Sequence, residues 1–264
     1  MLHLLKIEWL KIKNYRTFWI LSALFALSLY GVNEIAYTVQ QNAYSKAPPG
    51  AEMFIGTPPF RFPVVWQMVS YVSSFLLFFP GLIIIILMTN EFSYKTHRQN
   101  IIDGLSRTQF IYVKMLLCVL VALVATLIVF FVALFFGLYE NSAGFSFQNV
   151  QYVGMFFIET LSYTSLALLI ATLFRRSGIA IGVYFLYAEI LDQLLSLAAS
   201  HYFNGAGRYF PLESNDNLIP LPVLKNMVDQ LVAPPNVTYM LITAAVYLTI
   251  YFFVCKRRLE TADL

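Results

Sequence analysis

Six long apolar runs, separated by polar segments, constrain the fold of this chain more than any other feature. The runs Val64–Thr89 and Ile111–Leu138 each exceed the roughly 20 residues that an α-helix needs to cross a bilayer. Hydrophobic residues make up 59% of the 264 positions and charged residues only 12%. A soluble domain would need a larger polar shell. We therefore expect an all-α, polytopic membrane protein.

The apolar runs predict six transmembrane helices and the loops between them. The predicted spans are 17–39, 64–89, 110–138, 150–174, 179–199 and 237–254. Consecutive prolines mark residues 40–63 as a loop, and Pro80 with Gly81 predicts a kink in the second span. Residues 201–236 form a longer proline-rich loop, in which Val223–Val232 is expected to form a short interfacial or re-entrant helix.

The first 16 residues have the pattern of an amphipathic helix that lies in the membrane interface. Apolar residues recur near helical spacing, and positively charged residues lie between them. We expect Trp9 to lie at headgroup depth and Lys11, Lys13 and Arg16 to face anionic lipid. A signal peptide is the alternative, but the polar lead is too long and no small-residue cleavage site follows.

The distribution of lysine and arginine predicts the orientation in the membrane. The N-terminal segment has four of these residues, residues 90–114 have four, the turn at 175–176 has two and the C-terminal tail has three. Only four of the 17 fall in the loops on the other side. Because cytoplasmic loops are enriched in Lys and Arg, both termini are predicted to be cytoplasmic.

A polar island, residues 90–114, separates the second and third spans and holds six charged residues. Ser106 and Gln109 fit a capping box at the start of the third span, and Gly104 fits the end of a preceding short helix. We therefore expect a short helix at 93–103. The island is either a plain cytoplasmic loop or a docking element for a soluble partner, and the capped helix favours docking. The candidate docking residues are Glu91, Tyr94, Lys95, Thr96, His97, Arg98 and Asp103.

Three carboxylates inside predicted spans are candidates for a polar path or a substrate site. Glu159, Glu189 and Asp192 each cost free energy at membrane depth unless they are paired or hydrated. The alternative is that each one bonds to a neighbouring helix, and we expect Tyr or Ser partners among Tyr163, Tyr184, Tyr187 and Ser162. Phe75 and Phe79 share a helical spacing and either pack against a helix or lipid, or line an export path.

Signals of catalysis and of cofactor binding are missing from the sequence. It contains no G-x-x-x-x-G-K-[ST] loop and no H-E-x-x-H motif, and its three histidines are far apart. Cys118 and Cys255 lie inside apolar runs and are expected to be small buried residues, so no metal site is predicted. No basic stripe for nucleic acid appears outside the loops. We expect neither an enzyme nor a bound cofactor.

With these features in place, the chain resembles ABC transporter permeases of the ABC-2 exporter class. The likeness rests on three segments: Ile7–Trp19 at the amphipathic start, the island from Glu91 through Gly104–Arg107 to Lys114, and a last span that ends in Phe252, Phe253 and a Lys/Arg cluster. Where many relatives have Gly-Thr in the island, this chain has Lys95 and Thr96.

The resemblance implies partners for the chain and roles for two of its helices. Such permeases form dimers, either of two identical chains or of two related ones. Each dimer binds two copies of a separate ATPase subunit, which carries the ATP and Mg²⁺. Residues 1–16 would then be an elbow helix and residues 93–103 a coupling helix that enters a groove on the ATPase. The expected location is the inner membrane of a bacterium, in contact with its lipids.

Three functions remain open from the sequence. The first is the permease of an ATP-driven exporter. The second is a membrane anchor that couples an ATPase mechanically to an envelope complex without moving a solute. The third is a nucleotide-independent secondary transporter, against which no inverted repeat is visible. The substrate cannot be read from a fold of this kind.

Overall fold

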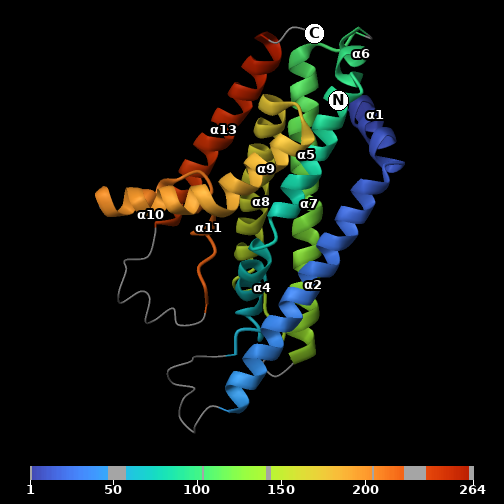
Figure 1. Ribbon diagram of the computed structural model, residues 1–264. Helices are drawn as coiled ribbons and strands as arrows, with labels where there is room; N and C mark the ends of the chain where they lie inside the picture. The colour runs from blue at the N-terminus through green and yellow to red at the C-terminus, as the bar shows by residue number, and fades with distance from the viewer. Residues whose placement is uncertain are drawn as a thin grey trace.

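The computed structural model describes residues 2–46, 58–102, 104–140, 144–203, 205–222 and 236–261, and within these ranges it contains helices and turns but no strand. This confirms the all-α fold class. Figure 1 shows the arrangement. The main helices are α1 (Leu2–Lys13), α2 (Arg16–Ser45), α4 (Val65–Ser74), α5 (Phe78–Ser93), α6 (Thr96–Ile102), α7 (Arg107–Glu140), α8 (Gln151–Phe174), α9 (Ser177–Leu186), α10 (Asp192–Tyr202) and α13 (Val237–Thr261). Short turns lie at η1 (Tyr187–Leu191), η2 (Ala206–Tyr209) and α11 (Glu213–Asp216).

The number of helices that can cross a membrane agrees with the sequence. Among the described residues, five helices are long and apolar enough, and the bent pair α4–α5 brings the number to six. Their outward faces carry exposed large apolar side chains such as Leu27 on α2 and Phe131 on α7. Such faces suit lipid rather than water. The chain is a multi-pass membrane protein.

Helix α8 forms the centre of the bundle. Two thirds (67%) of its apolar window is buried, whereas the other long helices bury 17–33% of theirs. Its buried residues include many small or hydroxyl-bearing ones, among them Thr160, Ser165, Ala167, Ala171 and Thr172. Small residues let neighbouring helices approach closely, and buried hydroxyl groups bond to their own helix: Thr160 and Thr172 each donate to the carbonyl four residues before.

The second predicted span is broken rather than merely kinked at Pro80. Helices α4 and α5 meet at 48° across residues 75–77, one turn before the proline. Pro80 is the third residue of α5, where the missing N–H is tolerated. The neighbouring Gly81 is required by packing, because a Cβ there would collide with the hydroxyl group of buried Tyr184 on α9.

The fifth predicted span, 179–199, belongs to a longer helical stretch that is not regular. Residues 177–202 are continuous helix, but η1 is a π-helical turn between α9 and α10. Figure 1 shows α10 running across the direction of α8 and projecting from the bundle. The interfacial helix predicted at 223–232 lies outside the described residues.

Helix α1 and the end of α13 lie at the same end of the bundle as α6 (Figure 1). Arg107, the first residue of α7, donates from Nη1 to the carbonyl oxygens of Leu259 at 3.0 Å and Glu260 at 2.6 Å. These carbonyls belong to the last turn of α13, where helices leave acceptors unpaired. The C-terminal helix is thus held against the end of the polar island.

Candidate functional site

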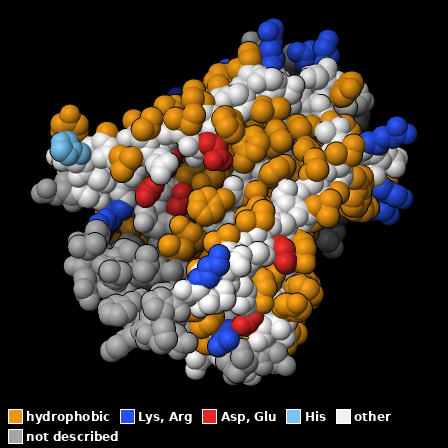
Figure 2. All heavy atoms as spheres, turned by 60° about the horizontal axis from the view of Figure 1, so that its bottom comes forward, with side chains coloured by type: hydrophobic (Ala, Val, Ile, Leu, Met, Phe, Trp, Pro, Cys, Tyr) orange, Lys and Arg blue, Asp and Glu red, His pale blue; other side chains and the backbone are white. Residues whose placement is uncertain are grey.

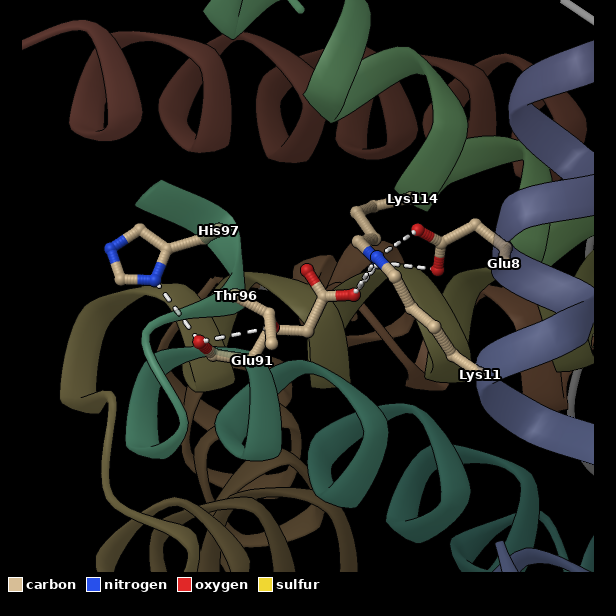
Figure 3. A network of polar contacts seen from close by, with 6 residues as sticks. All are labelled: Glu8, Lys11, Glu91, Thr96, His97 and Lys114. Carbon is tan, nitrogen blue, oxygen red and sulfur yellow. Dashed lines mark hydrogen bonds and ion pairs between the residues drawn. The ribbon is translucent and has the colours of Figure 1, made fainter. Parts of the chain in front are cut away.

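Four charged side chains form an ionic network next to α6 (Figure 3). Lys114 Nζ lies 2.5 Å from Glu8 Oε2 and 2.6 Å from Glu91 Oε1. Lys11 Nζ lies 2.9 Å from Glu8 Oε1 and 2.9 Å from Glu91 Oε1. Each ammonium group therefore bridges both carboxylates, and the four charges sum to zero.

The ionic network joins three helices that are distant in sequence. Glu8 and Lys11 lie one turn apart on α1, Glu91 lies near the end of α5, and Lys114 lies two turns into α7. Each helix end brings a polar side chain to the same depth, at the end of the bundle where α6 lies (Figures 1 and 3). The network ties the N-terminal helix to both sides of the polar island.

Most of the ionic network is shielded from solvent. The Lys114 side chain is 3% exposed, Glu91 7% and Glu8 9%, whereas Lys11 is 30% exposed. Buried charges are tolerated only when they are paired with good geometry. Lys114 gains a further contact, since its Nζ lies 5.2 Å from the centre of the Phe110 ring. Lys114 is therefore the residue whose loss leaves the most charge uncompensated.

The ionic network favours the charged forms of Glu8 and Lys11. Burial alone would raise the pKa of Glu8, but the ammonium groups of Lys114 and Lys11 bring it below its ordinary value. Burial would likewise lower the pKa of Lys11, but the carboxylates of Glu91 and Glu8 raise it above its ordinary value. Both pKa shifts lie away from neutral pH, as expected for side chains that form a structural tie between helices.

The backbone of Glu91 links the ionic network to α6. Its carbonyl oxygen accepts from Thr96 Oγ1 at 3.5 Å and lies 3.0 Å from His97 Nδ1 (Figure 3). Because a carbonyl only accepts, Nδ1 carries the proton in this arrangement. The His97 ring also packs edge-on against Phe92, 5.0 Å between centroids. α6 is thereby fixed relative to the end of α5.

The predicted docking residues divide into two groups. Glu91 points inward, and Thr96 and His97 are half-buried and bonded to it, whereas Tyr94, Lys95 and Arg98 are exposed. α6 begins at Thr96 and not at the predicted residue 93, because Lys95 adopts a left-handed conformation with φ 57° that ends the preceding turn. Asp103 lies outside the described residues.

The predicted interface residues also divide. Trp9 is 51% exposed and contacts Trp19 edge-on, and Trp19 Nε1 donates to the Lys13 carbonyl at 2.9 Å. The side chains of Lys13 and Arg16 are exposed, as an interfacial role requires. Lys11 differs, because its ammonium group is paired with Glu8 and Glu91 in the ionic network.

The carboxylates predicted inside spans meet at a second location. Glu159, 1% exposed, and Asp192, 2% exposed, line a pocket of about 240 Å³ together with the exposed Glu189. Phe75, at the break between α4 and α5, lines the same pocket, but Phe79 instead packs against Phe25 on α2. The two phenylalanines therefore do not form one stripe.

The partners of these carboxylates differ from those expected. Asp192 Oδ2 accepts from the backbone N–H of Leu212 at 3.3 Å and of Glu213 at 2.8 Å, and it also interacts with Tyr187, as expected. Glu159 interacts with the carboxyl group of Asp216 and the hydroxyl of Ser74.

The expected Tyr163 and Ser162 turn instead to α11. The Tyr163 hydroxyl donates to Asp216 at 3.3 Å, and Ser162 Oγ lies 3.1 Å from Asn215 Oδ1.

Sequence reasoning missed Glu8, Lys114, Glu213 and Asp216 as members of these two clusters. Glu8 and Lys114 are charges set next to long apolar runs, which is a usable signal that each needs a partner. Glu213 and Asp216 lie between Leu212 and the Leu218–Ile219 pair, all three of which are buried. In neither case does the sequence identify the residue with which each charged side chain interacts. Among the described residues, no group of His, Cys, Asp and Glu has the geometry to hold a metal ion.

Comparison with known proteins gives one family. The sequence profile of the family described as ABC-2 family transporter protein matches residues 4–190, more than two thirds of the chain. The matched range contains all four residues of the ionic network. Comparison with curated proteins finds no match.

Proposed function

The chain belongs to the ABC-2 transporter family, and we propose that it is the membrane-spanning permease subunit of an ATP-driven exporter, whose separate ATPase docks on α6. Family membership supports a permease component of an ABC transporter and implies association with an ABC ATPase. In this proposal ATP and Mg²⁺ bind to the ATPase, and this chain converts its closure into movement of helices.

The observation that carries the proposal is the ionic network beside α6. A docking element transmits movement only if it is fixed to the helices that must move. α6 is bonded to the Glu91 backbone, and the Glu91 carboxylate is paired with α1 and α7. Displacement of α6 would therefore act on three helices together. The exposed Tyr94, Lys95 and Arg98 would form the contact with the ATPase, where charges set orientation.

The proposed orientation puts α6 and both termini in the cytoplasm of a bacterium, with the bundle in the inner membrane. The excess of Lys and Arg in the segments near that end supports this orientation. We further propose two permease copies and two ATPase copies per complex. Helix α1 would lie in the membrane interface as an elbow helix, with Trp9, Lys13 and Arg16 facing headgroups.

Co-purification with an ABC ATPase from the same organism tests the proposal. The tagged chain, expressed with that ATPase, should retain it through purification, and Tyr94→Ala combined with Arg98→Ala should reduce the retained ATPase at least about tenfold, since hot-spot side chains each contribute about 2 kcal/mol or more. The matched control is Tyr202→Ala, because Tyr202 on α10 is 77% exposed and Tyr94 is 78% exposed. An equal loss in both variants, or no association with the unaltered chain, would exclude docking at α6.

A further inference from the structure

A pocket on one face of the bundle gathers five carboxyl groups from three parts of the chain. Glu159 comes from α8, Glu189 and Asp192 from the helical stretch 177–202, and Glu213 and Asp216 from α11. We call it the carboxylate pocket. Figure 2 shows acidic side chains grouped among hydrophobic ones on one face of the molecule. Because these carboxyl groups come from segments that are far apart in the sequence, the fold and not a local motif brings them together.

The carboxylate pocket has acceptors that the described residues do not satisfy. Glu159 Oε2 and Asp192 Oδ1 are buried and have no hydrogen-bond partner among those residues. Both side chains are at least nine-tenths buried and line the pocket. A buried carboxylate oxygen without a partner is costly, so these atoms indicate a ligand that donates hydrogen bonds.

The charge of the carboxylate pocket indicates that the ligand is positive. The described residues that line it include five Asp and Glu but no Lys or Arg. This contrasts with the ionic network, where two carboxylates are matched by two ammonium groups. Carboxylates in a membrane protein usually pair with a cation, a proton or water. The pocket lacks a protein cation among its described lining residues.

The size and walls of the carboxylate pocket favour an organic cation over a metal ion. No cluster with metal-binding geometry is found among the described residues. A volume of about 240 Å³ admits a group of several non-hydrogen atoms, since a water molecule occupies about 30 Å³ of liquid. Tyr71, Phe75 and Tyr163 supply aromatic surface, which attracts ammonium and guanidinium groups and accommodates apolar carbon.

We infer that the carboxylate pocket binds an ammonium or guanidinium group carried on an apolar or aromatic body, and that the substrate of this permease has that chemistry. The positive group would lie against Glu159, Asp192 and Asp216, with its body against Phe75. The pocket opens at Glu189 and Phe75, both exposed, which gives such a molecule an entrance. The assignment as substrate rests on the proposed function, but the binding does not.

A binding measurement on the chain alone tests the inference. The chain is placed in nanodiscs of phosphatidylcholine at pH 8, and the probe is radiolabelled 4-phenylbutylammonium, with neutral 4-phenylbutan-1-ol as the control ligand. We expect saturable binding of the ammonium compound at one site per chain and no saturable binding of the alcohol. Equal binding of the two compounds, or no saturable binding up to millimolar ammonium probe, would overturn the inference.

Variants locate the site. Glu159→Gln should weaken binding about tenfold or more, as expected for loss of a close opposite charge. Glu189→Gln at the entrance should weaken it less, about two- to fivefold, in the range of a solvent-exposed ion pair. Glu189 is exposed, so its replacement leaves the fold intact even if the Glu159 variant unfolds. The matched control is Glu34→Gln on α2, outside the pocket, which should bind like the unaltered chain. Unchanged affinity in a folded Glu189 variant would contradict the assignment.

Two further outcomes are decisive. Displacement of the probe by 150 mM Na⁺ but not by the same concentration of the bulkier N-methylglucamine cation would assign the pocket to inorganic cations and overturn the inference. Persistence of binding in both salts supports it. The assay contains no ATPase and no nucleotide, whereas co-purification contains no probe, so failure of one leaves the other result standing.

Discussion

Replacing Lys114 with methionine should destabilise the chain more than replacing any other member of the ionic network. Lys114 is 3% exposed, and its Nζ lies closer to the carboxylates of Glu8 and Glu91 than the Nζ of Lys11 does. Removing one partner of a buried ion pair costs about 3–5 kcal/mol, because the remaining charge stays buried. Lys11 still contacts both carboxylates at 2.9 Å, which places the expected loss at the lower end, about 3 kcal/mol.

The same reasoning predicts a smaller loss at Lys11. The Lys11 side chain is 30% exposed, and both Glu8 and Glu91 remain paired with Lys114 when Lys11 is replaced. We expect Lys11→Met to cost about 1 kcal/mol or less, in the range of solvent-exposed pairs. Lys13→Met, with an exposed side chain on the same helix, is the control and should change little.

The assay is the free energy of unfolding in mixed micelles, titrated with a denaturing detergent. A third variant separates charge from shape: Glu8→Gln and Glu91→Gln added to Lys114→Met should recover part of the loss, because no buried carboxylate is left unpaired and Lys11, which is 30% exposed, can turn to solvent. Equal losses at Lys11 and Lys114, or a Lys114 variant that loses less than about 1 kcal/mol, would refute the view that burial determines how much each lysine contributes to the free energy of unfolding.

Three further predictions follow from single residues. Burial and the charge of Glu213 raise the pKa of Asp216 from 3.8 to about 7. Between these values the folded chain keeps a proton that the unfolded chain loses, so stability from this group falls as pH rises to 7. Asp216→Asn should therefore raise the melting temperature relative to the unaltered chain more at pH 8 than at pH 5, and an equal shift at both would contradict this. Gly81→Ala should cost about 1–3 kcal/mol in the same detergent titration, because Tyr184 is fully buried and cannot yield; a neutral result would show that α5 and α9 separate easily. Lys95→Gly should leave stability unchanged or raise it by about 1 kcal/mol, since glycine adopts φ 57° without strain, and a loss would mean that the Lys95 side chain holds the turn.

Local signals in the sequence predicted the polar island well. The capping box is present as reciprocal bonds: the Ser106 N–H donates to Gln109 Oε1 at 3.0 Å, and the Gln109 N–H donates to Ser106 Oγ at 3.1 Å. Gly104 has φ 100°, as expected for the residue after a helix. Each feature depends only on residues within one or two helical turns, so it can be predicted from the local sequence alone.

Features that depend on packing between distant segments escaped sequence analysis. The break between α4 and α5 and the π-helical turn at 187–191 have no local sequence marker as clear as Pro80. The partner of a charge escaped for the same reason. Glu8 and Lys114 are 106 positions apart, and Lys11 read alone resembles a headgroup-binding lysine. Residue type showed that partners were needed, and only the fold showed which ones.

One helix connects the two clusters. Helix α5 carries Glu91 of the ionic network near one end, and at the other end it begins after the break at residues 75–77. Phe75 in this break and Ser74, the last residue of α4, line the carboxylate pocket. Sixteen residues of α-helix span about 24 Å, so a shift imposed at α6 is carried as a rigid displacement to the break. The neighbour that α5 packs against is α8, which supplies Glu159 and Tyr163 to the same pocket. Because only three residues join α4 to α5, sliding of α5 along α8 would also change the distance between Ser74, at the end of α4, and Glu159, which interact in the present arrangement. If the proposed function and the proposed cation site both hold, movement at the α6 end would thus alter how the carboxylate pocket holds a cation without any contact between the two sites.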